Sequence, residues 1–239
     1  MEILRRPSRM ENRDDCDALD LLNQDHAAVA ELFDLYESLH EREEKQVLVS
    51  RIIRALTVHA RIEQELFYPA LRRAIGDDTT MEDADVEHAM IRELMADLYR
   101  SNADASHFDG KMRTLAHLIE QHVEEEERQT FQKARASNLN LLVIGGQLDA
   151  YRAALESRYE LDTGGKELKA FLSAPTILGP TTAASASHKA GRPAKRDASS
   201  ASKRNGKPRH RIRGVLASRR RRARRSCQPE AETSEGEST

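Results

Sequence analysis

The sequence predicts an all-α protein: an up-down-up-down four-helix bundle with a short fifth helix and a disordered basic C-terminal tail. In several long segments apolar residues recur at steps of three and four, which is the spacing of amphipathic helices. No segment has the strict alternation of apolar and polar residues that indicates a half-buried strand. Beyond residue 180 the chain has no aromatic residue and is rich in Gly, Ser, Ala and basic residues, a composition typical of disorder.

Four amphipathic segments follow one another and are separated by short connectors. The first contains neither Gly nor Pro, and the second follows the charged connector 41–45 and ends before Gly76. Connectors this short favour antiparallel neighbours, as in an up-down bundle. The expected helices span about residues 17–40, 46–75, 81–100 and 111–136.

Two further expectations concern proline and glycine. Pro69 lies inside the second segment and should bend that helix, because proline cannot donate to the helical hydrogen-bond ladder. A shorter fifth helix is expected near 138–161, interrupted or loosened at Gly145 and Gly146.

Charge divides the chain into two unlike parts. Residues 1–180 carry 22 Lys and Arg against 35 Asp and Glu, a formal charge of −13, whereas residues 181–239 carry 16 against 5, a charge of +11. All ten aromatic residues lie in the first part. We therefore expect a flexible leader at 1–16, a folded helical domain at 17–160, and a disordered low-complexity basic tail with an acidic end at 161–239.

The composition also excludes several classes of protein. No run of about 18 apolar residues is present, so a transmembrane helix is not expected. Residues 1–15 lack the apolar core of a secretory signal. The two cysteines, Cys16 and Cys227, form neither a disulfide framework nor a CxxC metal knuckle, which is typical of a reducing compartment. We expect a cytoplasmic protein with no membrane partner.

Each bundle helix carries one histidine on its apolar stripe. Two of these histidines begin an HxxxE motif, whose i,i+4 spacing puts an imidazole and a carboxylate on the same helical face. Buried imidazoles and carboxylates are unfavourable unless they find partners, and a cation at the bundle centre would satisfy all of them together. The predicted metal ligands are His26, His59, Glu63, His88, His122 and Glu126.

The number and type of these donors favour a pair of metal ions. Six nitrogen and oxygen donors are too many for one structural zinc, which normally takes four ligands. Nitrogen and oxygen donors without thiolate favour two iron ions, with manganese as the alternative.

The segments around these residues resemble the hemerythrin family, specifically the bacterial HHE cation-binding domain, over roughly residues 17–160. They are Asn23-Gln24-Asp25-His26, His59 to Pro69 (HARIEQELFYP), Val86-Glu87-His88, and His122 to Glu127 (HVEEEE). The resemblance implies a four-helix bundle around a non-haem di-iron centre. It also implies that the histidines are terminal ligands and that Glu63 and Glu126 bridge the irons.

One position departs from the pattern of the oxygen carriers in this family. They resemble this chain but have a further histidine on the third helix, four residues after the first, where this chain has Arg92. Glu87 or a water is then a candidate substitute ligand. Binding, sensing or reaction with O₂, peroxide or nitric oxide is expected, with a peroxidase or ferroxidase as the alternative. Tyr68 is interpreted as a packing residue.

The basic tail raises a different class of function. Residues 188–225 contain all 16 Lys and Arg of the second part against the single acidic residue Asp197. Such a density of one charge attracts polyanions, and the lack of aromatic residues favours duplex DNA over single strands. The two interpretations are a nucleic-acid-associated protein, in which the bundle regulates the tail, and a solubilising low-complexity extension.

Overall fold

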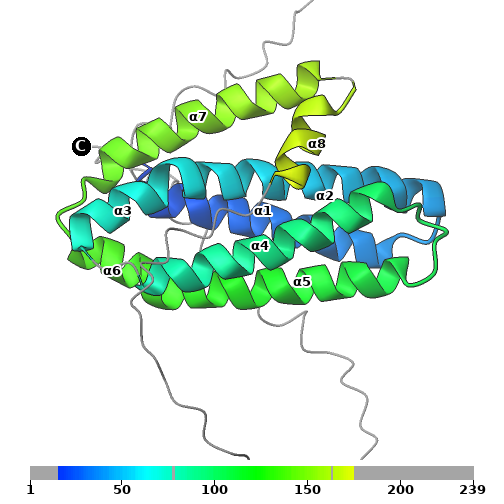
Figure 1. The fold of residues 1–239 in the computed structure, drawn as a ribbon, viewed down its shortest axis with the longest axis horizontal. Helices are drawn as coiled ribbons and strands as arrows, with labels where there is room; N and C mark the ends of the chain where they lie inside the picture. Colours follow the sequence, from blue (N-terminus) through cyan, green and yellow to red (C-terminus); the bar gives the residue numbers. More distant parts are fainter. Residues whose placement is uncertain (1–15, 77–78, 163, 175–239) are drawn as a thin grey trace, which may run out of the picture.

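The computed structural model describes residues 16–76, 79–162 and 164–174, and these form a bundle of long helices (Figure 1). No strand occurs in the described ranges, so the all-α prediction is confirmed. Residues 1–15 of the predicted flexible leader and residues 163 and 175–239 of the predicted tail, Cys227 included, lie outside the described residues.

Four antiparallel helical rods make up the bundle. The first is α1, and the third is α4. The second and fourth rods each consist of an α-helix, a five-residue π turn and another α-helix, without a break. The bounds are α1 Ala18–Ser38; α2 Arg42–Ile62, η1 Glu63–Phe67 and α3 Tyr68–Ile75; α4 Thr79–Arg100; and α5 Phe108–Glu125, η2 Glu126–Thr130 and α6 Phe131–Ala136.

Local sequence signals fix where these rods begin and end. Asp17 caps α1: its carboxylate accepts from the backbone N–H groups of Leu19 and Asp20 at 2.8 and 2.9 Å, which satisfies donors that the first helical turn leaves open. The second rod ends at Gly76, whose φ of 66° is left-handed, a conformation that glycine adopts without a steric penalty.

The two π turns start at the glutamates of the two HxxxE motifs. In η1 the Tyr68 N–H donates to the Glu63 carbonyl, and in η2 the Phe131 N–H donates to the Glu126 carbonyl. This five-residue spacing places Tyr68 and Phe131, both buried, one turn beyond the glutamates. The irregularity predicted at Pro69 thus lies just before that residue. A proline is not required for such a π turn, because η2 forms without one. Short π segments of this kind are frequent at functional sites.

Two more helices, α7 (Leu141–Leu161) and α8 (Lys166–Ser173), lie outside the four rods (Figure 1). Helix α7 packs against α1 and α2 and is unbroken at Gly145, contrary to the predicted interruption. A β-carbon at Gly145 would lie 2.8 Å from the Ala18 backbone nitrogen, so this glycine allows the two helices to approach closely.

Regular structure also continues past residue 161, where the sequence was expected to become disordered. Helix α8 packs on α4 and buries Leu168 and Leu172. A helix of 8 residues is too short to give a recognisable periodic pattern. Among the described helices, none combines the length and apolar character needed to span a bilayer.

Candidate metal centre

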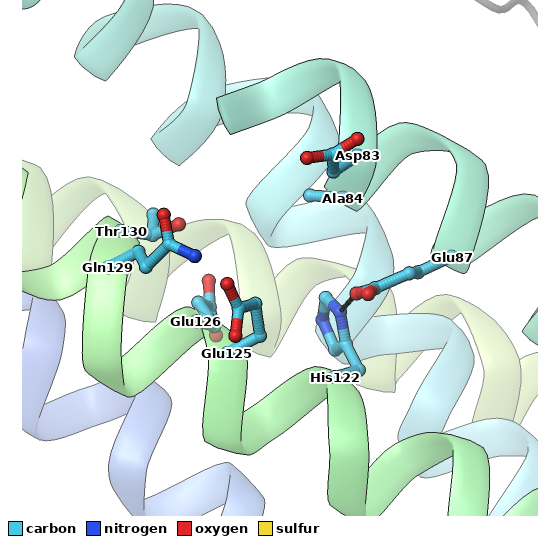
Figure 2. Close-up of a pocket in the computed structure, with 8 residues that line it drawn as sticks. All are labelled: Asp83, Ala84, Glu87, His122, Glu125, Glu126, Gln129 and Thr130. Carbon is cyan, nitrogen blue, oxygen red and sulfur yellow. Dashed lines mark hydrogen bonds and ion pairs between the residues drawn. The ribbon is translucent and has the colours of Figure 1, made fainter. Parts of the chain in front are cut away.

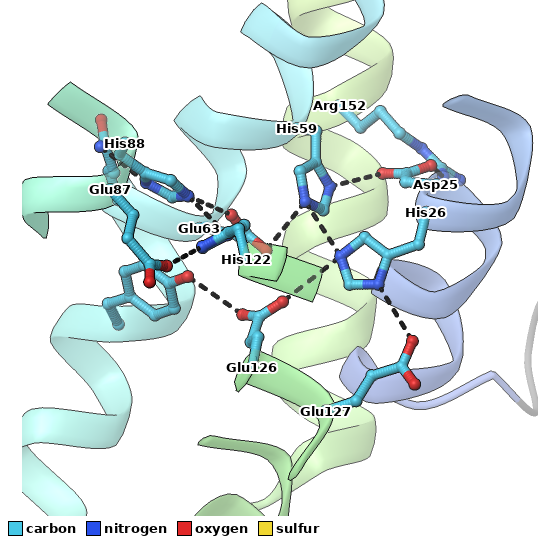
Figure 3. A network of polar contacts seen from close by, with 12 residues as sticks. Asp25, His26, His59, Glu63, Glu87, His88, His122, Glu126, Glu127 and Arg152 are labelled. Carbon is cyan, nitrogen blue, oxygen red and sulfur yellow. Dashed lines mark hydrogen bonds and ion pairs between the residues drawn. The ribbon is translucent and has the colours of Figure 1, made fainter. Parts of the chain in front are cut away.

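The six predicted ligand residues meet halfway along the bundle. Each has 7% or less of its surface exposed, and Glu63 has none. They come from all four rods, as antiparallel packing at a common depth requires. Their side chains form two groups, which we call position one and position two (Figure 3).

Position one comprises His26, His59, Glu63 and Glu126. The Nε2 atoms of the two histidines are 3.2 Å apart. The Oε1 atom of Glu63 lies 3.0 Å from His59 Nε2, and the Oε2 atom of Glu126 lies 3.3 Å from His26 Nε2. One candidate donor atom from each residue falls within 4.8 Å of the others, a spacing that one cation can span.

Position two comprises Glu63, His88 and His122. The Nε2 atoms of these histidines lie 2.9 Å apart, and His88 Nε2 is 3.3 Å from the Oε2 atom of Glu63. The two oxygens of Glu63 therefore face different positions, which is the arrangement of a bridging carboxylate.

Glu126 does not share this arrangement. Its Oε2 atom faces position one, whereas its Oε1 atom accepts a hydrogen bond of 3.0 Å from the Tyr68 hydroxyl. The resemblance implied that both glutamates bridge the irons, and in the structure the oxygens of the two glutamates have different surroundings. Tyr68 packs as predicted, fully buried, and in addition contacts the centre.

The unpaired atoms of the cluster indicate that a cation fits it. Both oxygens of Glu63 and the Oε2 atom of Glu126 are buried without a hydrogen-bond partner. A buried ionised carboxylate is strongly unfavourable unless it is paired or coordinates a metal. Imidazole nitrogens and carboxylate oxygens are ligands that iron, manganese and zinc accept.

Each histidine turns its other ring nitrogen, Nδ1, toward a polar side chain of a neighbouring rod (Figure 3). Such outer partners orient an imidazole and raise its basicity as a ligand. The Gln64 amide can donate or accept at its contact, and the Glu87 carboxylate accepts from His122. The carboxylates of Glu127 and Asp25 face their histidines at ion-pair distances that are longer than a hydrogen bond. The pairs are His26 with Glu127 at 3.6 Å, His59 with Asp25 at 3.7 Å, His88 with Gln64 at 2.8 Å, and His122 with Glu87 at 2.7 Å.

Sequence reasoning assigned none of these four residues to an outer role. Glu87 was a candidate substitute ligand, but it contacts the outer nitrogen of His122 and is not part of either position. A signal was present, because each outer partner directly neighbours a predicted ligand in the sequence, as Asp25 neighbours His26. Arg92 is also outside the cluster: its guanidinium lies 5.7 Å from the ring centre of Phe171 in α8.

The carboxylates change the proton affinities of the imidazoles around them. Burial lowers the pKa of His59, but the Glu63 and Asp25 carboxylates outweigh this effect and hold that pKa well above its usual value. Burial raises the pKa of Glu63, but contacts with His59 and His88 hold it well below the ordinary range. Burial and the neighbouring His122 lower the pKa of His88. A cation at position one must therefore displace protons, which couples its binding to pH.

A narrow pocket of about 20 Å³ reaches the centre between α4 and the fourth rod (Figure 2). His122 and Glu126 line its buried part, and the carboxylates of Asp83, Glu87 and Glu125 also line it. This volume holds about one water-sized molecule, and the acidic lining disfavours anions.

Comparisons with known proteins agree with this fold. Residues 17–134 match the family described as Hemerythrin HHE cation binding domain. A crystal structure of an HHE cation binding domain-containing protein from Mycobacterium kansasii, an Rv2633c homolog, has a TM-score of 0.56 and 21% identity, and the match covers 66% of this chain and 98% of that one.

Two curated relatives match part of the chain. The uncharacterized protein Rv2633c of Mycobacterium tuberculosis is 31% identical over 112 residues, which cover 46% of this chain and 68% of that protein. A DNA nickase of Nostoc sp. is 28% identical over 155 residues, which cover 65% of this chain but only 43% of that protein. With an all-α bundle that gathers four histidines and two glutamates at its centre, the chain belongs to the hemerythrin family of HHE cation-binding domains.

Proposed function

We propose that this chain is a cytoplasmic non-haem di-iron protein that binds, senses or reacts with O₂, peroxide or nitric oxide. Its ligands are the six residues of positions one and two, with one iron ion at each position. Manganese is the alternative metal, because it accepts the same nitrogen and oxygen donors.

The observation that carries this proposal is the orientation of the Glu63 carboxylate. Its two oxygens approach histidines of different positions, at 3.0 Å from His59 Nε2 and 3.3 Å from His88 Nε2. With its oxygens turned toward different positions, this carboxylate could reach a single cation through only one oxygen. The other oxygen would stay buried without a metal partner, at a cost of several kcal/mol in order of magnitude. Two cations sharing Glu63 remove that cost.

The pocket beside His122 supports a ligand of one to three atoms. A space of about 20 Å³ suits a molecule such as O₂, NO or H₂O₂ better than a larger organic substrate. Its carboxylates disfavour anions, so neutral O₂, NO and H₂O₂ are favoured over charged relatives. They also attract Fe²⁺, which keeps a ferroxidase reaction as the alternative on the same site.

The residues around the two positions suit redox chemistry in which protons are held at defined atoms. Two iron ions would supply the electrons for reducing a bound oxidant. The Tyr68 hydroxyl donates to Glu126 Oε1 in a fully buried setting, so it holds a proton at the edge of position one. Outer carboxylates and Gln64 hold the imidazoles in place, and the packed core around them limits access of bulk water.

We expect the purified chain, reconstituted with Fe²⁺ and exposed to air, to retain about two irons per chain and to be coloured. Metal analysis and an optical spectrum after desalting measure both properties. Steady-state turnover with peroxide or Fe²⁺ then separates an enzyme from a binding or sensing protein. Trace metal after desalting would contradict the proposal.

The two glutamates should differ when each is substituted. Glu63→Ala removes an oxygen from both positions and is expected to abolish loading of both, whereas Glu126→Ala removes a ligand from position one and should lose about one metal per chain. Glu124→Ala, which changes an exposed carboxylate two residues from Glu126, is the matched control and should load as the unmodified chain does. Equal loading of all three variants would refute the ligand assignment.

A second candidate function is association with duplex DNA. Residues 188–225 carry 16 basic residues against Asp197, and the Nostoc relative is named a DNA nickase. That protein is more than twice as long as the part that matches here, so its activity is not carried over to this chain. We propose only that the basic segment binds the phosphate backbone without strong sequence preference.

Duplex binding should depend steeply on salt and on the basic segment. If about six to ten basic residues contact phosphates, affinity is expected to fall roughly 10³–10⁵-fold between about 50 and 200 mM salt. Fluorescence anisotropy with labelled duplex DNA measures this, comparing the full chain with a chain that ends at residue 180. Absence of binding at low salt by the full chain would leave the solubilising interpretation of the segment.

A further inference from the structure

Helix α7 lies beyond residues 17–134, which match the family, yet it contacts the rods that carry position one. It packs against α1, α2 and the π turn η1. Leu148, Leu155 and Tyr159 are its buried anchors. The polar side chains between these anchors are therefore held at fixed places above position one.

Arg152 of α7 reaches the outer partner of His59 (Figure 3). Its Nη1 atom donates to Asp25 Oδ1 at 2.7 Å, and its Nη2 atom donates to Asp149 Oδ1 at 2.7 Å. The second oxygen of Asp25 lies 3.7 Å from His59 Nδ1. One oxygen of Asp25 is thus held by the guanidinium, while the other faces the imidazole.

Burial strengthens the ion pair between Arg152 and Asp25. The side chains of Arg152 and Asp25 are each only 17% exposed, so solvent screens their attraction less than it screens a surface ion pair. Without Arg152 the Asp25 carboxylate would lose its hydrogen-bonded cation and could rotate away from His59. A residue of α7 thus holds the carboxylate that faces His59.

A neighbouring set of contacts fixes the register of α7 on the second rod. Arg61 Nη2 donates to the Tyr151 hydroxyl at 2.8 Å, and Arg61 Nε donates to Glu65 Oε1 at 2.7 Å. The Tyr151 hydroxyl also donates to Glu65, which lies in the π turn that begins with Glu63. These contacts keep Arg152 within reach of Asp25.

We propose that Arg152 is a positioning residue for position one: it holds Asp25, and Asp25 orients His59 toward the cation. The inference rests on the proposed metal-binding function and extends the centre beyond the four rods. Removing a side chain that orients a metal-binding histidine typically costs about 10–100-fold in metal affinity.

Titration of the metal-free full-length chain with Co²⁺, followed by its absorption bands and by calorimetry, tests this role. The unmodified chain is expected to show two binding events. Arg152→Gln should weaken one of them about 10–100-fold and leave the other unchanged. Arg152→Lys should be intermediate, because an ammonium group keeps the charge but not the forked geometry. Arg158→Gln, which removes an exposed charge from the same helix, is the matched control.

Two further variants assign the weakened event to position one. Asp25→Asn should reproduce the effect of Arg152→Gln, and Glu87→Gln should weaken the other event, because Glu87 contacts His122 of position two. In a His59→Ala chain, Arg152→Gln should cause no additional loss, since the residue through which it acts is gone.

Several outcomes would overturn the role of Arg152. In the first, the Arg152→Gln chain binds Co²⁺ as the unmodified chain does. In the second, Arg152→Gln weakens both binding events equally. In the third, Arg152→Gln lowers the Co²⁺ affinity by the same factor whether or not His59 is present. Thermal unfolding monitored by circular dichroism checks each variant, and Arg152→Lys decides the question if Arg152→Gln does not fold. An unmodified chain that binds no Co²⁺ or iron would refute the metal function itself, a result distinct from all of these.

Discussion

The burial of the Glu63 carboxylate between two pairs of imidazoles is the constraint on which the rest of the centre depends. Glu63 has no exposed surface, and neither of its oxygens has a hydrogen-bond partner. A buried carboxylate of this kind must be neutralised or coordinated. The histidines of all four rods converge on it and on Glu126, and the two oxygens of Glu63 divide them into two cation positions. The bundle thus gathers a set of buried polar groups that cations would stabilise.

The outer partners of the histidines link the four rods in a closed ring. Each rod supplies the partner for the histidine of the next: α1 for α2, the second rod for α4, α4 for α5, and the fourth rod for α1. Every imidazole therefore faces a polar side chain of a rod other than its own. The π turns contribute to this ring, because Gln64 and Glu127 each lie one residue inside a π turn. Displacing one rod would disturb the histidine of another, so the centre and the packing of the bundle stabilise each other.

Much of the fold, and the clustering of the six predicted ligand residues, could be predicted from local spacing. Helical periodicity gives the four rods, and the HxxxE spacing puts His59 and Glu63 on one face, which requires no knowledge of the tertiary structure. The inequality of the two glutamates could not be predicted, since it arises from the Tyr68 hydroxyl, which a π turn brings to Glu126 from another rod. Helix α8 and the role of Arg152 were missed for the same reason. Each depends on a contact between segments far apart in the sequence, and the periodicity of one segment does not indicate such contacts.

The central claim is that Glu63 is shared by two cations, and anomalous X-ray scattering from crystals of the iron-loaded chain tests it most directly. Data on both sides of the iron absorption edge identify iron atoms independently of the protein phases. The account predicts two iron peaks about 3.5–4 Å apart, one on each side of the Glu63 carboxylate, with His26 and His59 at one peak and His88 and His122 at the other. A single peak with one oxygen of Glu63 left uncoordinated, or no peak at these histidines, would contradict it.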